Sequence, residues 1–273
     1  MPCLQRLCFC SGALRSCVLS HETKRGTKIK TYSLHLTAPL QKHTVVRSGQ
    51  GLSFEVVDTV RADEFFYCEP TQASDWYKVT LLKWYRHSGE QITGYIHKSR
   101  VQIIEDLKIS DQSVIILSVL KKEKQLADRF LETNKKYNRV LDKWDDKNDS
   151  VAYKKAVGEL EPYSETTYSA ILQILPKVFC NTKDMTIIEN FISTMWSDKG
   201  SASEEPSFSI GKCFACDPKL LSARVRQIKN KEEKELIVNH IEWGLLNIFS
   251  VDEKESTDTK YLGLKNQLEK VRN

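Results

Sequence analysis

The stretch that decides the fold runs from Trp76 to Ile104 and reads W-Y-K-V-T-L-L-K-W-Y-R-H-S-G-E-Q-I-T-G-Y-I-H-K-S-R-V-Q-I-I. Two runs rich in β-branched and aromatic residues flank a polar tip, Arg86 to Gln91, that contains Gly89. Such runs around a glycine-bearing turn are typical of a β-hairpin with a loop longer than two residues. The sequence therefore predicts a hairpin at this position.

Two parts of this stretch resemble the second half of a bacterial SH3-like (SH3b) domain. They are W-Y-K-V at 76–79 and G-E-Q-I-T-G-Y-I-H-K-S-R-V at 89–101. Upstream, V-R-S-G at 46–49 and V-V-D-T-V at 56–60 resemble the first half. The resemblance covers residues 43–106. It implies a small, non-catalytic all-β barrel of the kind often attached to bacterial wall-associated proteins. We expect a closed or nearly closed barrel of five or six strands.

Many aromatic residues fall within this region, and strand geometry sends neighbouring side chains to opposite faces. Each neighbouring pair of rings should therefore supply one ring to the core and one to the surface. Surface rings beside loops suit the stacking of a peptide or a sugar. The candidates for such a ligand groove are Arg47, Tyr67, Trp76, Tyr77, Tyr95 and His97. We expect the groove where the Arg47–Ser53 loop, Tyr67 and the hairpin tip approach one another; an ordinary edge position remains an alternative for His97.

From Ile109 the spacing of apolar residues becomes helical, and no convincing pair of strands follows. The sequence predicts an α+β protein of two domains, an SH3-like barrel at 43–106 and an all-α helical domain at 110–271. Pro176 should kink or stop the helix that contains it. The expected helices span about 110–144, 163–179, 183–196, 219–228, 232–249 and 261–271.

Residues 1–42 are expected to be an extension and linker. Two basic residues and a short, broken apolar patch leave a degenerate targeting segment as an alternative. The alternation at 31–36 permits a short strand at the end of this linker.

The eight cysteines do not have the distribution of a disulfide framework, because four of them are bunched before residue 18. We expect Cys68 and Cys180 to be unpaired and buried. Cys213 and Cys216 form a C-x-x-C before a helix start, but they lack the βαβ surroundings of a redox motif and the further ligands of a zinc site. We expect both to be reduced and free of metal. His240 lies on an apolar helix, where a core or boundary histidine is the expected role.

Composition excludes some classes of protein. The chain of 273 residues is 40% hydrophobic and 28% charged, as in globular proteins, and its net charge of +5 is too small and diffuse to predict nucleic-acid binding. No apolar run is long enough for a transmembrane helix. Common catalytic and nucleotide-binding motifs are absent, so no catalytic residue, metal or cofactor is predicted.

Three functions remain open. The first is a binding or scaffold protein whose barrel holds a peptide or peptidoglycan-like ligand while the helical domain docks a protein partner. The second is a cell-wall enzyme with catalysis in the helical domain. The third is an inhibitor or immunity-type protein that sequesters an enzyme. The sequence favours the first and leaves the compartment, envelope or cytoplasm, undecided.

Overall fold

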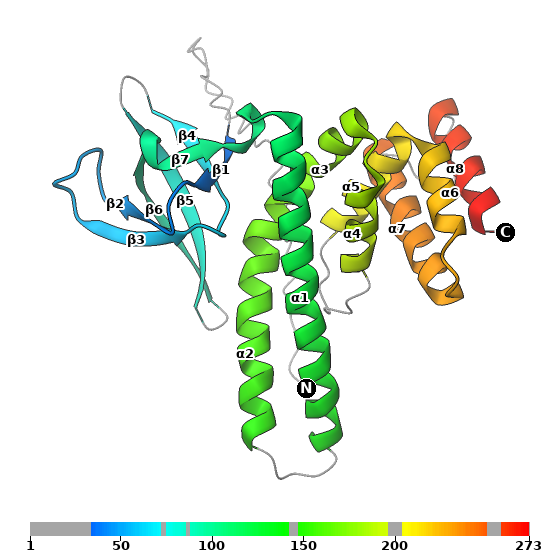
Figure 1. Cartoon of the computed structure of the whole chain (residues 1–273), viewed down its shortest axis with the longest axis horizontal. Helices are drawn as coiled ribbons and strands as arrows, with labels where there is room; N and C mark the ends of the chain where they lie inside the picture. Colours follow the sequence, from blue (N-terminus) through cyan, green and yellow to red (C-terminus); the bar gives the residue numbers. More distant parts are fainter. Residues whose placement is uncertain are drawn as a thin grey trace, which may run out of the picture.

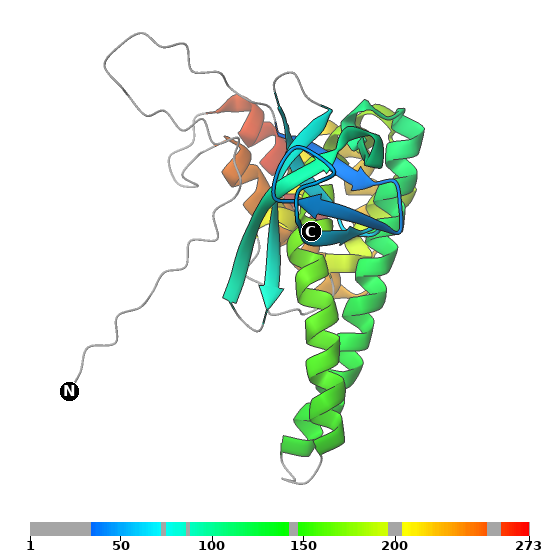
Figure 2. The same cartoon turned by 90° about the vertical axis from the view of Figure 1, so that its left-hand side faces the viewer.

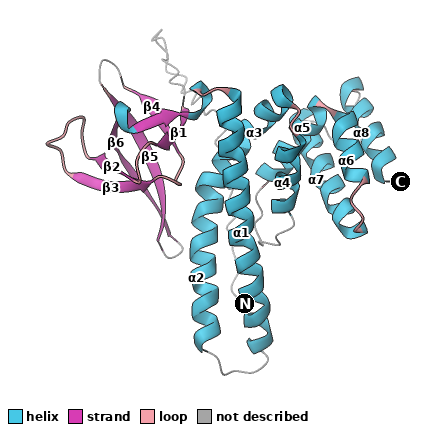
Figure 3. Cartoon of the chain, in the orientation of Figure 1, coloured by secondary structure: helices cyan, strands magenta, loops and turns pink. Residues whose placement is uncertain are grey.

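A computed structural model describes residues 34–71, 75–85, 88–141, 147–195, 204–249 and 258–272. Within these residues an antiparallel sheet precedes a set of helices (Figures 1 and 3). The strands are β1 (His35–Pro39), β2 (His43–Arg47), β3 (Val56–Arg61), β4 (Phe66–Pro70), β5 (Trp76–Tyr85), β6 (Ser88–His97) and β7 (Val101–Ile103). This arrangement confirms the α+β layout, with strands first and helices after them.

The predicted hairpin is β5 and β6, which pair without a register shift from Trp76↔His97 to Tyr85↔Ser88. Only positions 86 and 87 separate the paired ends, so the expected loop of more than two residues is wrong. Strand alternation turns one face of the pair inward, where Val79, Leu81 and Ile96 are buried. These side chains form the inner core of the sheet with apolar residues of the other strands. The β-branched and aromatic runs therefore form strands for the reason that the sequence suggested: alternate side chains in the described part of the hairpin fill this core.

The sheet is open. Its strand order is β3-β2-β6-β5-β4-β1-β7, so β3 and β7 are its two ends. The prediction of a closed or nearly closed barrel with five or six strands is not confirmed. The extra strand is β1, which comes from the segment expected to be linker and pairs with both β4 and β7.

Side chains accept hydrogen bonds from backbone N–H groups of the edge strand β3. Asp58 Oδ1 accepts a hydrogen bond from the backbone N–H of Thr59 at 2.7 Å. Glu64 Oε2 accepts one from the backbone N–H of Arg61 at 3.0 Å. With these two N–H groups bonded, β3 is a poorer template for pairing with another chain.

The described residues after Leu107 form helices and short connections between them. Two 3₁₀ turns, η1 (Lys98–Arg100) and η2 (Ile104–Asp106), flank β7 and lead into the helices. The helices are α1 (Ile109–Leu141), α2 (Lys147–Tyr163), α3 (Ser169–Thr182), α4 (Met185–Met195), α5 (Glu205–Cys216), α6 (Pro218–Arg226), α7 (Lys231–Phe249) and α8 (Thr259–Arg272). A π-helical segment, Ser164–Tyr168, joins α2 to α3. The paired α1 and α2 stand between the sheet and α3–α8 and project beyond both (Figures 1 and 2).

Pro176 does not stop its helix, so that part of the prediction is wrong. It lies inside α3, which continues to Thr182. Proline has no N–H to donate to the carbonyl four residues earlier, which here belongs to Leu172. Ser209 Oγ of α5 donates to that carbonyl at 2.8 Å and is itself buried. A neighbouring helix thus satisfies the group that proline leaves unbonded.

The sheet and the helices share one apolar core. Leu36 and Ala38 of β1, with Ile104, belong to the same buried cluster as the apolar faces of α1 and α3 to α8. Polar contacts reinforce this junction: Thr167 Oγ1 accepts from the backbone N–H of Phe65 at 3.2 Å and donates to the carbonyl of Asp63 at 3.1 Å. The side chain of Asp63 also forms an ion pair with Lys122 of α1.

Candidate binding face of the sheet

A row of polar and aromatic side chains crosses four strands on the outer face of the sheet. The register places Arg47 of β2 beside Tyr95 of β6, Tyr95 beside Lys78 of β5, and Lys78 beside Glu69 of β4. Directly paired residues point to the same face, so these four side chains lie in line. All four are partly exposed, and Lys78 Nζ is 3.9 Å from Glu69 Oε2. The row offers two cations, one carboxylate and one ring to solvent.

Trp76 and His97 lie at the next pair along the same face. Their rings meet edge to face with centroids 5.2 Å apart, and only 9% of Trp76 is exposed. The backbone N–H of Ser99 donates to Nδ1 of His97 at 3.2 Å. A neutral imidazole whose Nδ1 accepts carries its proton on Nε2. His97 therefore has an N–H to donate, and its ring packs against the ring of Trp76.

An exposed apolar patch continues from Arg47 into the loop between β2 and β3. The exposed fractions are 77% for Leu52 and 48% for Phe54. Arg47 Nη1 donates to the carbonyl of Phe54 at 2.7 Å, which holds the loop beside the row. Gly49 packs against the ring of Phe54, where an added Cβ would lie 2.7 Å from the ring atom Cγ. The neighbouring side chains of Val45, Val56 and Val57 are exposed as well.

Two of the predicted groove residues are not on this open face. Tyr67 of β4 packs against the helical core, and burial, followed by the charges of Glu105 and Glu205, raises its pKa to about 12. Tyr77 packs against the inner core of the sheet, and its pKa is raised chiefly by burial. Tyr67 therefore does not line the open face, because β1 and the helices cover it. Tyr77 points to the other face of the sheet, where it stays partly exposed.

The three parts of the predicted groove do not all come together. The Arg47–Ser53 loop projects from the side of the sheet away from the helices, whereas Tyr67 faces them (Figure 1). Residues 86–87 of the hairpin tip lie outside the described residues. What remains of the prediction is Arg47, Tyr95 and His97, with Trp76 largely buried beneath His97. Sequence reasoning missed Lys78 and Glu69, because their place in the row depends on the register between β4, β5 and β6.

In the helical part, a serine and a histidine meet between α5 and α7. Ser207 Oγ and His240 Nδ1 are 2.7 Å apart, and Ser207 is buried. Burial lowers the pKa of His240. Within the described residues no carboxylate hydrogen-bonds to His240, so the orienting acid of a catalytic triad is missing there. The pair is a partly buried contact between helices, in line with the expected core or boundary position of His240.

This contact gives stability a pH dependence that can be measured. The folded chain holds His240 neutral below its ordinary pKa of 6.5, while the unfolded chain protonates it. Its contribution is therefore complete above about pH 6.5 and is lost as pH falls through the lower, folded-state pKa. We expect His240→Gln to lose less stability than the wild type between pH 7 and pH 5, measured by urea unfolding. His43→Gln, at an exposed position, is the control; equal pH dependence in all three proteins would contradict the assignment.

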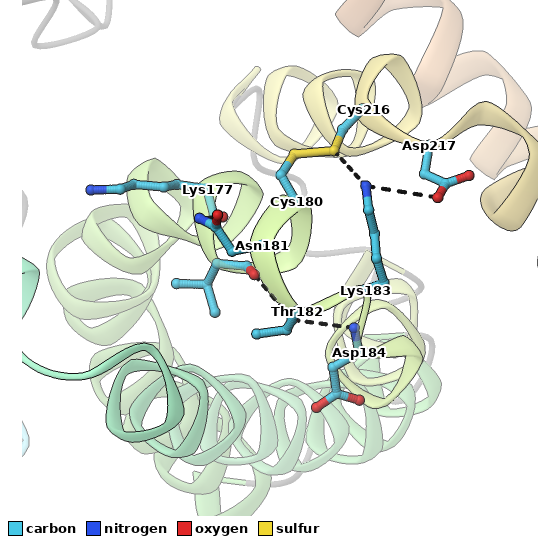
Figure 4. The surroundings of a disulfide bond; sticks show 9 residues. Lys177, Cys180, Asn181, Thr182, Lys183, Asp184, Cys216 and Asp217 are labelled. Atoms are coloured by element: carbon cyan, nitrogen blue, oxygen red, sulfur yellow. Dashed lines mark hydrogen bonds and ion pairs between the residues drawn. A yellow bond between two sulfur atoms is a disulfide. The ribbon is translucent and has the colours of Figure 1, made fainter.

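The cysteines differ from expectation at two positions. Cys180 of α3 and Cys216 of α5 form a disulfide, so the predictions of an unpaired Cys180 and a reduced Cys216 are wrong (Figure 4). Cys68 and Cys213 are free and buried. Cys68 Sγ lies 2.8 Å from Thr37 Oγ1 inside the sheet, and burial, the largest influence, raises its pKa to about 11.

No protein-family model, curated protein or solved structure matches this chain. Among the described residues, no group of three or more His, Cys, Asp or Glu side chains is placed to hold a metal ion. Within the same residues, every helix is too short or too polar to cross a membrane.

Proposed function

We propose that this chain is a non-catalytic binding protein that uses its SH3-like sheet to hold an extended peptide or a cell-wall peptide. The resemblance of residues 43–106 to SH3b domains supports this function. The main structural support is the uncovered part of the outer face, which carries Arg47, Lys78, Tyr95 and His97 while the helices cover the part around Tyr67.

The chemistry of this face favours a ligand with both apolar and carboxylate groups. Arg47 and Lys78 supply positive charge, and His97 supplies a donor. Tyr95 offers a ring that can stack while its hydroxyl stays in water. The exposed Leu52 and Phe54 extend the surface with apolar area. Peptides that end in carboxylates, including the peptide stems of a bacterial wall, combine these groups.

We assign the helical part to docking of a protein partner. The α1–α2 pair extends beyond the sheet and the other helices (Figures 1 and 2). Its inner contact consists of apolar side chains such as Leu126, Phe130 and Leu160, which hold the two helices together without help from the sheet. A projecting pair of helices is well suited to contact a second protein.

Replacing Tyr95 by alanine tests the proposed ligand site. We expect affinity for soluble peptidoglycan fragments or acidic peptides to fall by roughly 1–3 kcal/mol, as for an interface anchor, with little change in thermal stability. Titration calorimetry measures the affinity. Trp243→Ala is the matched control, because Trp243 is an exposed ring on α7, in the helical part. Unchanged affinity in Tyr95→Ala, or a sharply lower melting temperature, would contradict this role.

A further inference from the structure

The disulfide joins two helices that are far apart in the chain. Cys180 lies in the last turn of α3, and Cys216 is the last residue of α5. Their Cα atoms are 5.9 Å apart, and 36 positions of sequence separate them. Both residues are partly exposed, unlike the two other described cysteines, which are buried. A reagent in solution can therefore approach this bond.

An ammonium group lies beside one of the two sulfur atoms. Lys183 Nζ is 3.0 Å from Cys216 Sγ and 3.7 Å from Asp217 Oδ2 (Figure 4). Lys183 follows α3 directly and adopts a left-handed backbone conformation with φ of 55°. This turn brings its side chain from the end of α3 to the end of α5. The ammonium group of Lys183 therefore lies where the ends of α3 and α5 meet.

Cys216 lies between the end of α5 and the start of α6. Asp217, the next residue, is the N-cap of α6, and its side chain accepts from the backbone N–H of Leu220 at 3.1 Å. The N-terminal end of a helix carries partial positive charge. Cys216 is also the last residue of α5, and the C-terminal end of a helix carries partial negative charge, so the two helix ends oppose each other at this residue. A thiolate at Cys216 would therefore be stabilised chiefly by the ammonium group of Lys183.

We propose that Cys180 and Cys216 form a thiol–disulfide exchange site that reacts with small external thiols. An external thiolate attacks Cys180 Sγ, the bond between the two cysteines breaks, and Cys216 leaves as a thiolate beside Lys183. A second external thiolate then attacks the external sulfur of the mixed disulfide, which releases Cys180 and one oxidised external disulfide. The reverse sequence, with an external disulfide as oxidant, restores the bond. Two electrons pass to the protein in the first direction and return in the second.

Cys213, the other cysteine of the C-x-x-C, takes no part in this exchange. It is fully buried, and burial raises its pKa far above that of an ordinary thiol. A buried neutral thiol is a poor nucleophile. The reactive pair is therefore formed between helices and not within the sequence motif.

The test follows reduction of the full chain by glutathione and by dithiothreitol at neutral pH without denaturant. Acid quenching, alkylation and peptide mass spectrometry report each cysteine separately. We expect the rate to rise in proportion to thiol concentration and glutathione to be found on Cys180. Lys183→Asn, which tolerates the left-handed backbone, should slow the release of Cys216 by about 3- to 10-fold, since a less stabilised thiolate is a poorer leaving group. Lys183→Arg should restore the rate.

Lys177→Gln is the matched control for the loss of charge. Lys177 is exposed on α3, and its side chain points away from the disulfide (Figure 4). We expect wild-type rates in this variant. Reduction that is independent of thiol concentration or needs denaturant would overturn the proposal, as would glutathione on Cys216. Equal rates in Lys183→Asn and the wild type, or two free thiols after treatment with glutathione disulfide, would also overturn it.

Discussion

Replacing Gly244 by alanine is expected to lower the free energy of unfolding by about 3 kcal/mol, at the upper end of the cost of overpacking a core. Gly244 lies where α7 crosses α5. A Cβ added there would overlap the carbonyl oxygen of Ser207 and lie 3.0 Å from the Cα of Gly211. Both neighbours are backbone, so they cannot move aside without separating the helices. Alanine is otherwise favoured over glycine in a helix by about 1 kcal/mol, so steric overlap must reverse the usual sign.

Gly158→Ala is the matched control for this prediction. Gly158 also lies inside a helix, α2, but an added Cβ would meet no atom within 4 Å. The substitution should stabilise the protein by about 0.5–1 kcal/mol, because only the helix preference acts there. Urea unfolding of both variants decides the point. A stabilised or unchanged Gly244→Ala would show that α5 and α7 do not approach as closely as described.

The sequence was most informative where local patterns fix structure. The two-residue alternation of Trp76 to Ile104 predicted the β5–β6 hairpin, and helical spacing after Ile109 predicted the helical part. Between Phe54 and Thr80 the described residues form strands and turns, as that alternation requires. These features depend on neighbouring residues along the chain, which a single sequence displays directly.

Features that depend on distant partners could not be predicted in this way. The effect of Pro176 is offset by Ser209, which lies 33 positions further along the chain, on another helix. The pairing of Cys180 with Cys216 follows from the packing of α3 on α5, and spacing alone does not encode it. Strand alternation correctly separated Trp76 from Tyr77. It could not indicate that the helices cover Tyr67 on the outer face.

The residues of the candidate site also fall into these two groups, those that the sequence predicted and those that it could not. Arg47, Tyr95 and His97 were predicted from the resemblance and from alternation, and they lie on one open face. Lys78 and Glu69 complete the row only through the pairing of β4, β5 and β6. The place of each side chain on its own strand was visible in the sequence, whereas the order of strands was not. Register between strands therefore determined which residues form the site.

Leu36→Ala is expected to lower the free energy of unfolding by roughly 2–5 kcal/mol, the range for leucine truncation in a core. Leu36 belongs to β1 but is fully buried among side chains of the helical core. If the sheet and the helices form one cooperative unit, its loss should weaken both parts. Hydrogen exchange with mass spectrometry should show a similar loss of amide protection in the β5–β6 hairpin and in α3.

Leu34→Ala distinguishes the effect of position from that of side-chain volume. Leu34 lies two residues earlier and 44% of it is exposed, so the same truncation should change stability little. The division of the sequence at 43–106 and 110–271 makes a different prediction for Leu36→Ala. Two independently folding domains would confine the loss of protection to the sheet and leave α3 unchanged. That result would mean that the core shared by β1 and the helices contributes little to the stability of the helical part.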